Sequence, residues 1–125
     1  MTENELSKII VDCCYKIHTT LGPGLLESVY EEVLCYELGK NNLAFYRQRG
    51  IPVIYDEVRM ELGFRADIIV ENKVIIEIKS VEHIAPVHPK QLLTYLRITG
   101  LKLGMLVNFN EALIKDGIHR IVNNL

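Results

Sequence analysis

Apolar residues recur at helical spacing in three segments of the chain. Residues 5–20 and 25–38 each carry an apolar residue at about every third or fourth position, and a Gly-Pro-Gly turn separates them. Residues 88–100 form the third segment, because Pro89 suits the first turn of a helix and Gly100 its end. We therefore expect three helices. The apolar stripe of the second helix consists of Leu26, Val29, Tyr30, Val33 and Leu34.

A different period, alternation at every second position, marks the strands. From Val58 to Val70 each even position is apolar, which is typical of a strand with one buried face, and Gly63 suggests a bend or bulge within it. A short apolar run at 103–107 fits a buried central strand. The remaining expected strands are residues 51–55, 74–80 and 118–122.

The hairpin closed by residues 71–73 has one register that keeps charge out of the core. In that register all opposed pairs on one face are apolar. On the other face Asp67 lies opposite Glu77 and Arg65 lies opposite Lys79, with Cβ atoms about 4.5–5.5 Å apart. The apolar pairs are Val70 with Val74, Ile68 with Ile76, and Ala66 with Ile78.

Two carboxylates at this separation repel each other when both are ionised. A cation between them, or a proton on one of them, relieves the repulsion. Mg²⁺ prefers oxygen ligands and commonly binds one or two carboxylates together with water and phosphate. The hairpin alone leaves two interpretations open. One is a divalent-metal site at Asp67 and Glu77, and the other is a surface ladder in which Asp67 pairs with Lys79 and Arg65 with Glu77.

Three further polar residues lie on the expected helices, and the first of them borders an apolar stripe. Glu27 lies three residues before Tyr30 on the second helix. Gln91 and Tyr95 are four residues apart on the third helix, on a different face from its leucines. Because the strand after this helix must join the sheet, we expect the helix to pack across it. These residues favour the functional interpretation of the two acids.

With these residues the chain resembles a known group of proteins. The segment Gly24-Leu25-Leu26-Glu27-Ser28-Val29-Tyr30 matches the signature of the GxxExxY protein family. Asp67 followed by Glu77-Ile78-Lys79 is similar to the D…(D/E)xK core of the PD-(D/E)XK nuclease superfamily. Gln91-Leu92-Leu93-Thr94-Tyr95 resembles the QxxxY motif of its RecB-like branch. The resemblance spans residues 18 to about 120, and Ala66 stands where the superfamily's name has a proline that the chemistry does not require.

The resemblance implies an α/β fold with a restriction-endonuclease-like core. Helices would flank a central mixed sheet of about four strands. Asp67 and Glu77 would bind Mg²⁺ or Mn²⁺, helped by the backbone carbonyl of Ile78. The expected cofactor is therefore a divalent metal ion.

The same resemblance implies roles for the other motif residues. Lys79 would orient or polarise the attacking water, and Glu27 would support the metal or its waters. Gln91 and Tyr95 would position the scissile phosphate or the Lys79 ammonium. Such a set suffices for phosphodiester hydrolysis.

Three arginines, Arg47, Arg49 and Arg65, are the nearest candidates for contacts with substrate phosphate. The alternative for each is a solvated strand arginine. The function we expect is Mg²⁺-dependent nuclease activity, with DNA as the nucleic acid. A silent or weak nuclease-fold protein that binds nucleic acid or assembles with partners is one alternative, and a different phosphate-ester hydrolase is another. Whether the chain is an enzyme stays open at this point.

Length and charge set broader limits. A chain of 125 residues predicts one domain, residues 1–125. The formal net charge of -2 disfavours strong non-specific DNA binding by a monomer, whereas a homodimer would pool two sets of arginines. No segment approaches the ~18 apolar residues of a membrane span. The acidic N-terminus has no apolar signal core behind it, so we expect a cytoplasmic protein without a membrane partner.

Overall fold

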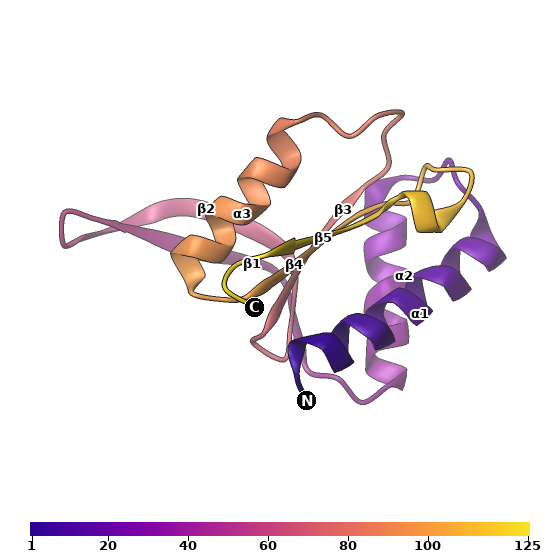
Figure 1. Ribbon diagram of the computed structural model, residues 1–125, viewed down its shortest axis with the longest axis horizontal. Coiled ribbons are helices and arrows are strands. Elements are labelled where there is room, and N and C mark those ends of the chain that lie inside the picture. The colour runs from indigo at the N-terminus through magenta and orange to yellow at the C-terminus, as the bar shows by residue number, and fades with distance from the viewer.

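The chain folds into a five-stranded mixed sheet with helices on both faces (Figure 1). The computed structural model describes the backbone of residues 1–125 and every side chain except that of Leu62. The strands lie in the order β1-β2-β3-β4-β5. The elements are α1 (Glu3–Leu21), α2 (Glu27–Lys40), β1 (Phe45–Tyr55), β2 (Val58–Val70), β3 (Val74–Lys79), α3 (Val87–Thr99), β4 (Leu103–Asn108), the short 3₁₀ helix η1 (Ile114–Asp116) and β5 (Ile118–Val122).

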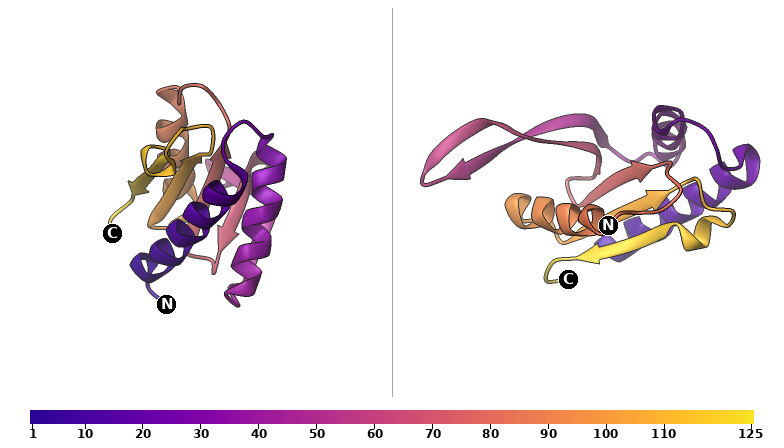
Figure 2. Two further views of the ribbon diagram at one scale, coloured as in Figure 1. Left: turned by 90° about the vertical axis from the view of Figure 1, so that its right-hand side faces the viewer. Right: turned by 90° about the horizontal axis from the view of Figure 1, so that it is seen from above.

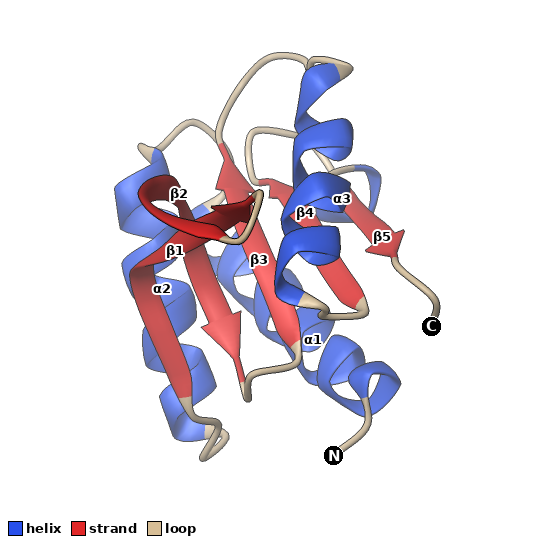
Figure 3. Ribbon diagram, turned by 90° about the vertical axis from the view of Figure 1, so that its left-hand side faces the viewer, coloured by secondary structure: helices blue, strands red, loops and turns tan.

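This architecture confirms the predicted α/β class with a restriction-endonuclease-like arrangement. The sheet has five strands where about four were expected. Strands β1–β2, β2–β3 and β4–β5 are antiparallel, and β3–β4 is parallel. The parallel pair needs a crossover connection, which α3 supplies. Figure 3 shows the sheet with α3 in front and with α1 and α2 behind.

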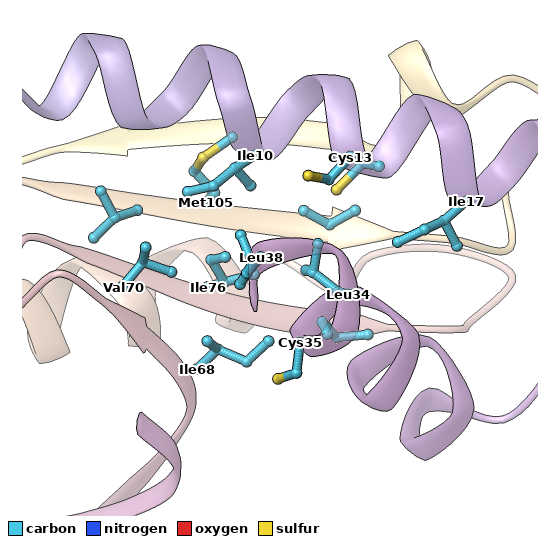
Figure 4. Packing of buried hydrophobic residues seen from close by; sticks show 14 of the residues in the cluster. Ile10, Cys13, Ile17, Leu34, Cys35, Leu38, Ile68, Val70, Ile76 and Met105 are labelled. Carbon is cyan, nitrogen blue, oxygen red and sulfur yellow. The ribbon is translucent and has the colours of Figure 1, made fainter. Parts of the chain in front are cut away.

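The first core lies between the sheet and the helices α1 and α2. Thr2 and Glu5 form a capping box that starts α1, and the helix then buries one stripe against the sheet. Helix α2 begins at Glu27, two residues later than expected, and its predicted stripe is partly wrong: Leu26 is 73% exposed and Val29 is also exposed. The helix is turned so that Tyr30 and Leu34 face inward. Figure 4 shows the resulting cluster, with Ile10, Cys13, Ile17, Leu34, Cys35, Leu38, Ile68, Val70, Ile76 and Met105 labelled.

A second core lies under α3 on the opposite face of the sheet. Leu92 and Leu96 of α3 pack against Ile69, Ile75 and Leu106. The helix comes so close to β4 that a Cβ atom on Gly104 would lie 2.8 Å from the side chain of Leu92. The face that carries Asp67 and Glu77 is therefore covered by a helix.

The distal halves of β1 and β2 form a ribbon that reaches beyond the rest of the sheet (Figure 2). Asp56 and Glu57 close it with positive φ angles of 53° and 64°, as a type I′ turn requires. The register shifts between Ile51 and Val53, close to the bulge predicted at Gly63 on the facing strand. The pairing of β2 with β3 ends at Ile68 and Ile76, whereas β2 continues its pairing with β1 into the ribbon.

Candidate metal and nuclease site

The hairpin between β2 and β3 brings the two predicted acids together. The pairs Val70–Val74, Ile69–Ile75 and Ile68–Ile76 follow the predicted register. The ladder stops there. The expected direct pairs Asp67–Glu77, Ala66–Ile78 and Arg65–Lys79 are therefore wrong, because β2 bends away with the ribbon. In its place the Ile78 N–H donates to Asp67 Oδ2 at 2.9 Å. The carboxylate of Asp67 thus occupies the position that a backbone acceptor would otherwise take.

Glu77 is a buried acid of the site with a strongly raised pKa. It is 9% exposed, and its Oε1 has no hydrogen-bond partner within the described part of the chain. Burial, followed by the charge of Asp67 and hydrogen bonding with it, raises the pKa of Glu77 to about 9. The nearby charge of Lys79 acts in the opposite direction but is outweighed. In the metal-free chain Glu77 therefore carries a proton at neutral pH.

Helix α3 places Tyr95 over the same acids. Burial and then the charges of Glu77 and Asp67 raise the pKa of the Tyr95 phenol, while a hydrogen bond with Gln91 lowers it. The Tyr95 ring stacks on Phe64 of β2, with centroids 3.8 Å apart and the planes 6° from parallel. Stacking fixes the ring, so the phenol is held beside the carboxylates. Gln91, one turn earlier, is exposed.

Glu27 lies at the end of β3, next to the residue that follows Lys79. The N–H of Ser80 donates to Glu27 Oε2 at 3.4 Å, and the Ser80 hydroxyl donates to the Leu25 carbonyl at 2.6 Å. A hollow of about 470 Å³ opens here, lined in part by Glu27, Ser28 and Asn110. The start of α2 is therefore tied to the end of β3 that carries Lys79.

Tyr30, three positions after Glu27, shapes the loop that precedes α2. Its buried hydroxyl donates to the Gly22 carbonyl at 2.6 Å and accepts from the Leu25 N–H at 3.1 Å. Its ring stacks on Phe109, with centroids 4.4 Å apart. The tyrosine fixes the loop before α2, in which Gly24 has a φ of 98°. This loop sets where Glu27 enters the helix.

Two further residues belong to the site although no motif in the sequence predicted them. Gln48 of β1 donates from Nε2 to Asp67 Oδ1 at 3.2 Å. Asn108, fully buried at the end of β4, bonds both the N–H and the C=O of Val81 and so orders the chain after β3. An amide in an otherwise apolar strand, as in Leu103–Asn108, is a signal that could have pointed to Asn108. No signal in the sequence distinguishes Gln48.

The structure separates the three arginines. Arg47 pairs with Glu31 of α2, with Nη2 2.9 Å from Glu31 Oε2. Arg49 lies over the ring of Tyr46, with its guanidinium carbon 4.1 Å from the ring centroid. Arg65 is exposed on β2 opposite Gly50. Arg49 and Arg65 remain available to a ligand, whereas Arg47 is engaged within the chain.

The donor set fits a small divalent cation that prefers oxygen. Asp67 and Glu77 supply two carboxylates, one of them with an unpartnered buried oxygen. In an extended strand the N–H and C=O of one residue point to the same side, so the Ile78 carbonyl faces the side of Asp67. In the described part of the chain, no group of three or more His, Cys, Asp and Glu side chains could hold a metal. The set suits an ion that keeps several waters, such as Mg²⁺.

Comparison with known proteins identifies the class. Residues 4–121 match the family model described as the PD-(D/E)XK nuclease superfamily. The chain belongs to this superfamily, which is a group of nuclease-type proteins that generally use divalent metals. Neither a search of curated proteins nor a search of solved structures found a match. No helix in the described chain has the length and apolar character needed to cross a membrane.

Proposed function

We propose that the protein is a Mg²⁺- or Mn²⁺-dependent nuclease that hydrolyses phosphodiester bonds, with DNA as its main substrate. One observation carries the proposal: the buried carboxyl of Glu77 has an unpartnered oxygen and lies beside Asp67, which helps to raise its pKa to about 9. A buried unpartnered acid is costly in a fold that gains nothing from it. A divalent cation would supply the missing partner and displace the proton.

The metal ligands and Lys79 would have different roles in hydrolysis. A bound divalent cation would supply positive charge to the phosphate and lower the pKa of water. Asp67, Glu77 and the Ile78 carbonyl would hold that cation. Lys79, half-buried beside Glu77, would donate hydrogen bonds to the attacking water or to a phosphate oxygen.

The remaining residues of the site would act on the substrate or on the water structure. Tyr95 and Gln91 would donate to the scissile phosphate from α3, and Glu27 would accept from waters at the end of β3. Arg49 and Arg65 would contact flanking phosphates. We assign the chain to the GxxExxY branch because Gly24, Glu27 and Tyr30 act as one unit: the glycine and the tyrosine shape the loop that positions the acid.

Two substitutions test this division of roles. Glu77→Gln keeps the shape of the side chain and removes the carboxylate, so we expect loss of both metal binding and cleavage. Lys79→Met removes the ammonium, so we expect metal binding to persist while cleavage falls by roughly a hundredfold or more. Calorimetric titration with Mn²⁺ and cleavage of labelled oligonucleotides measure the two properties. Cleavage that is unchanged in both variants would remove the mechanism.

The substrate needs a separate comparison. Single- and double-stranded DNA and RNA of the same sequence should be incubated with the wild-type chain and Mg²⁺ or Mn²⁺. We expect DNA to be cleaved faster than RNA, and Lys79→Met to lose both activities in parallel. Faster cleavage of RNA would support the proposed nuclease activity but contradict the proposal that DNA is the main substrate.

A nucleic-acid-binding or assembly module with little cleavage is the second candidate function. The small ligand set favours it, since among the described residues no group of three or more His, Cys, Asp and Glu side chains could hold a metal. In this case the wild-type chain would bind Mn²⁺ and retain oligonucleotides without cleaving them. The cleavage assay above separates the two candidates.

A further inference from the structure

Gln48 occupies an unusual position in the sheet. Its neighbours Arg47 and Arg49 pair regularly with Ile68 and Ala66 of β2, which places Gln48 opposite Asp67. Its own φ is +50°, inside a strand where the surrounding residues are extended. Residues other than glycine rarely adopt such angles, and they persist where the surroundings hold them in place. Something must therefore hold Gln48 in this conformation.

The side chain of Gln48 provides the explanation, because it bridges two acids. Its Nε2 donates to Glu31 Oε1 at 2.6 Å and to Asp67 Oδ1 at 3.2 Å. A side-chain amide has two N–H bonds, so one nitrogen can serve both carboxylates. The bridge links α2 to the acid on β2.

The far end of the bridge is anchored by an ion pair. Glu31 is buried, and its Oε2 accepts from Arg47 Nη2 at 2.9 Å and from Arg47 Nε at 3.3 Å. Both oxygens of Glu31 are thus occupied, one by Arg47 and one by Gln48. Glu31 is held in a single orientation and in turn holds the Gln48 amide.

The near end of the bridge fixes the plane of the Asp67 carboxylate. Asp67 Oδ2 accepts from the Ile78 N–H at 2.9 Å, and Oδ1 accepts from Gln48. One contact alone would let the Asp67 side chain exchange between χ1 rotamers about the bond between Cα and Cβ and rotate about the bond between Cβ and Cγ. Two contacts, one from each neighbouring strand, remove that freedom while leaving lone pairs on both oxygens.

We infer that Gln48 is a positioning residue, which holds Asp67 in the orientation that a divalent cation needs, and that Glu31 and Arg47 hold Gln48. The inference rests on the proposed function for the identity of the ion. It moves Arg47 from the substrate contacts to the support of the metal site. Groups that orient metal ligands typically change metal affinity by about 10–100-fold when they are removed.

The test uses two substitutions of Gln48 with matched controls. Gln48→Ala removes the amide, and Gln48→Gly removes it while allowing the positive φ, so that a folding defect in the first variant is avoided in the second. Asn42 also has a positive φ, of 59°, but lies in the exposed turn after α2. Asn42→Ala and Asn42→Gly therefore reproduce the backbone effects without touching the acids.

Two readouts are measured on the full chain. Calorimetry gives the Kd for Mn²⁺, and three-bond NMR couplings give the χ1 distribution of Asp67 in the metal-free protein. We expect both Gln48 variants to weaken Mn²⁺ binding about tenfold or more and to average the Asp67 rotamer, while the Asn42 variants match the wild-type chain in both readouts.

An unchanged Asp67 rotamer in both Gln48 variants would overturn the inference, whatever the metal affinity. A Gln48 variant that loses thermal stability but keeps the wild-type Kd for Mn²⁺ would also overturn the inference, because Gln48 would then have only a structural role. If the wild-type chain binds no Mn²⁺, the proposed function fails. Averaging of Asp67 in the variants would then still uphold Gln48 as the residue that positions it.

Discussion

At the scale of single residues, the proposed metal site depends on how Glu77 is buried. The sequence identifies it as an acid that faces Asp67, and this much follows from alternation along two strands. Its raised pKa depends on the cover that α3 provides, which adds desolvation to the repulsion from Asp67. The spacing of residues therefore predicts which acids meet, but not their state of protonation.

The raised pKa of Glu77 makes stability depend on pH. Between about pH 4.5, where an ordinary carboxyl ionises, and about pH 9, the folded chain retains a proton that the unfolded chain has lost. The free energy of unfolding should therefore fall as pH rises through this window, by up to about 1.4 kcal/mol per pH unit. Glu77→Gln should lose this slope. Urea unfolding of both chains at pH 6, 7 and 8 in the presence of a chelator measures it, and equal slopes would contradict the assignment.

Gln48 shows where prediction from sequence ends at this scale. Its importance comes from a backbone angle of +50° and from contacts with residues 17 and 19 positions away in the chain. Neither property leaves a mark on local composition. The role of Arg47 could not be predicted from the sequence either. Beside two other candidate arginines it was expected to contact phosphate, and only the fold brings it to Glu31.

At the scale of elements, the periods of apolar residues predicted nearly all helices and strands. The exceptions have physical causes. Strand β1 starts at Phe45, before the alternating segment, because it pairs with the buried end of β2 through its backbone. Leu26, which precedes α2, and Val29, in its first turn, face solvent, whereas the buried Tyr30 hydroxyl ties down the loop before the helix.

The loop before α2 can be tested through that hydroxyl. Tyr30→Phe keeps the ring stack on Phe109 and removes the bonds to Gly22 and Leu25. We expect a loss of about 1–3 kcal/mol in the free energy of unfolding, and faster amide hydrogen exchange at Leu25. Tyr36→Phe serves as the control, because Tyr36 is exposed. Equal losses in the two variants would contradict the role given to Tyr30.

The packing of α3 on β4 can be tested at Gly104. An added Cβ would lie within 3.0 Å of three side-chain atoms of Leu92, which is itself buried. Gly104→Ala should therefore destabilise the chain by about 1–3 kcal/mol through overpacking. Gly39 of α2 has open space around it, so Gly39→Ala should leave stability equal or slightly higher. Thermal unfolding compares them, and a neutral Gly104→Ala would contradict the close approach.

At the scale of the whole molecule, the topology brings the site together from both faces of the sheet. Helix α2 supplies Glu27 and Glu31 from one side, and α3 supplies Tyr95 from the other, while β2 and β3 carry the acids between them. The order of these elements was predictable, and so was the meeting of Asp67 with Glu77. The early end of the β2–β3 ladder was not, because alternation along β2 does not indicate where the strand stops pairing with β3 and continues with β1 alone.

Binding of an ion to the folded chain alone must also stabilise the whole molecule. At about one hundred times its Kd, Mn²⁺ should add roughly 2.7 kcal/mol to the free energy of unfolding. Thermal unfolding with increasing Mn²⁺ measures this as a rising Tm. Glu77→Gln should show no rise, and an equal rise in the variant would place the ion elsewhere.

The protonation of Glu77 is tested by counting the protons released when the metal binds. Calorimetric titration of the wild-type chain with Mn²⁺ at pH 7, in two buffers of different ionisation enthalpy, gives that number. Because Glu77 is protonated in the metal-free chain, we predict release of about one proton for each ion bound. Binding without proton release, or no binding at all, would contradict the proposed site at Asp67 and Glu77.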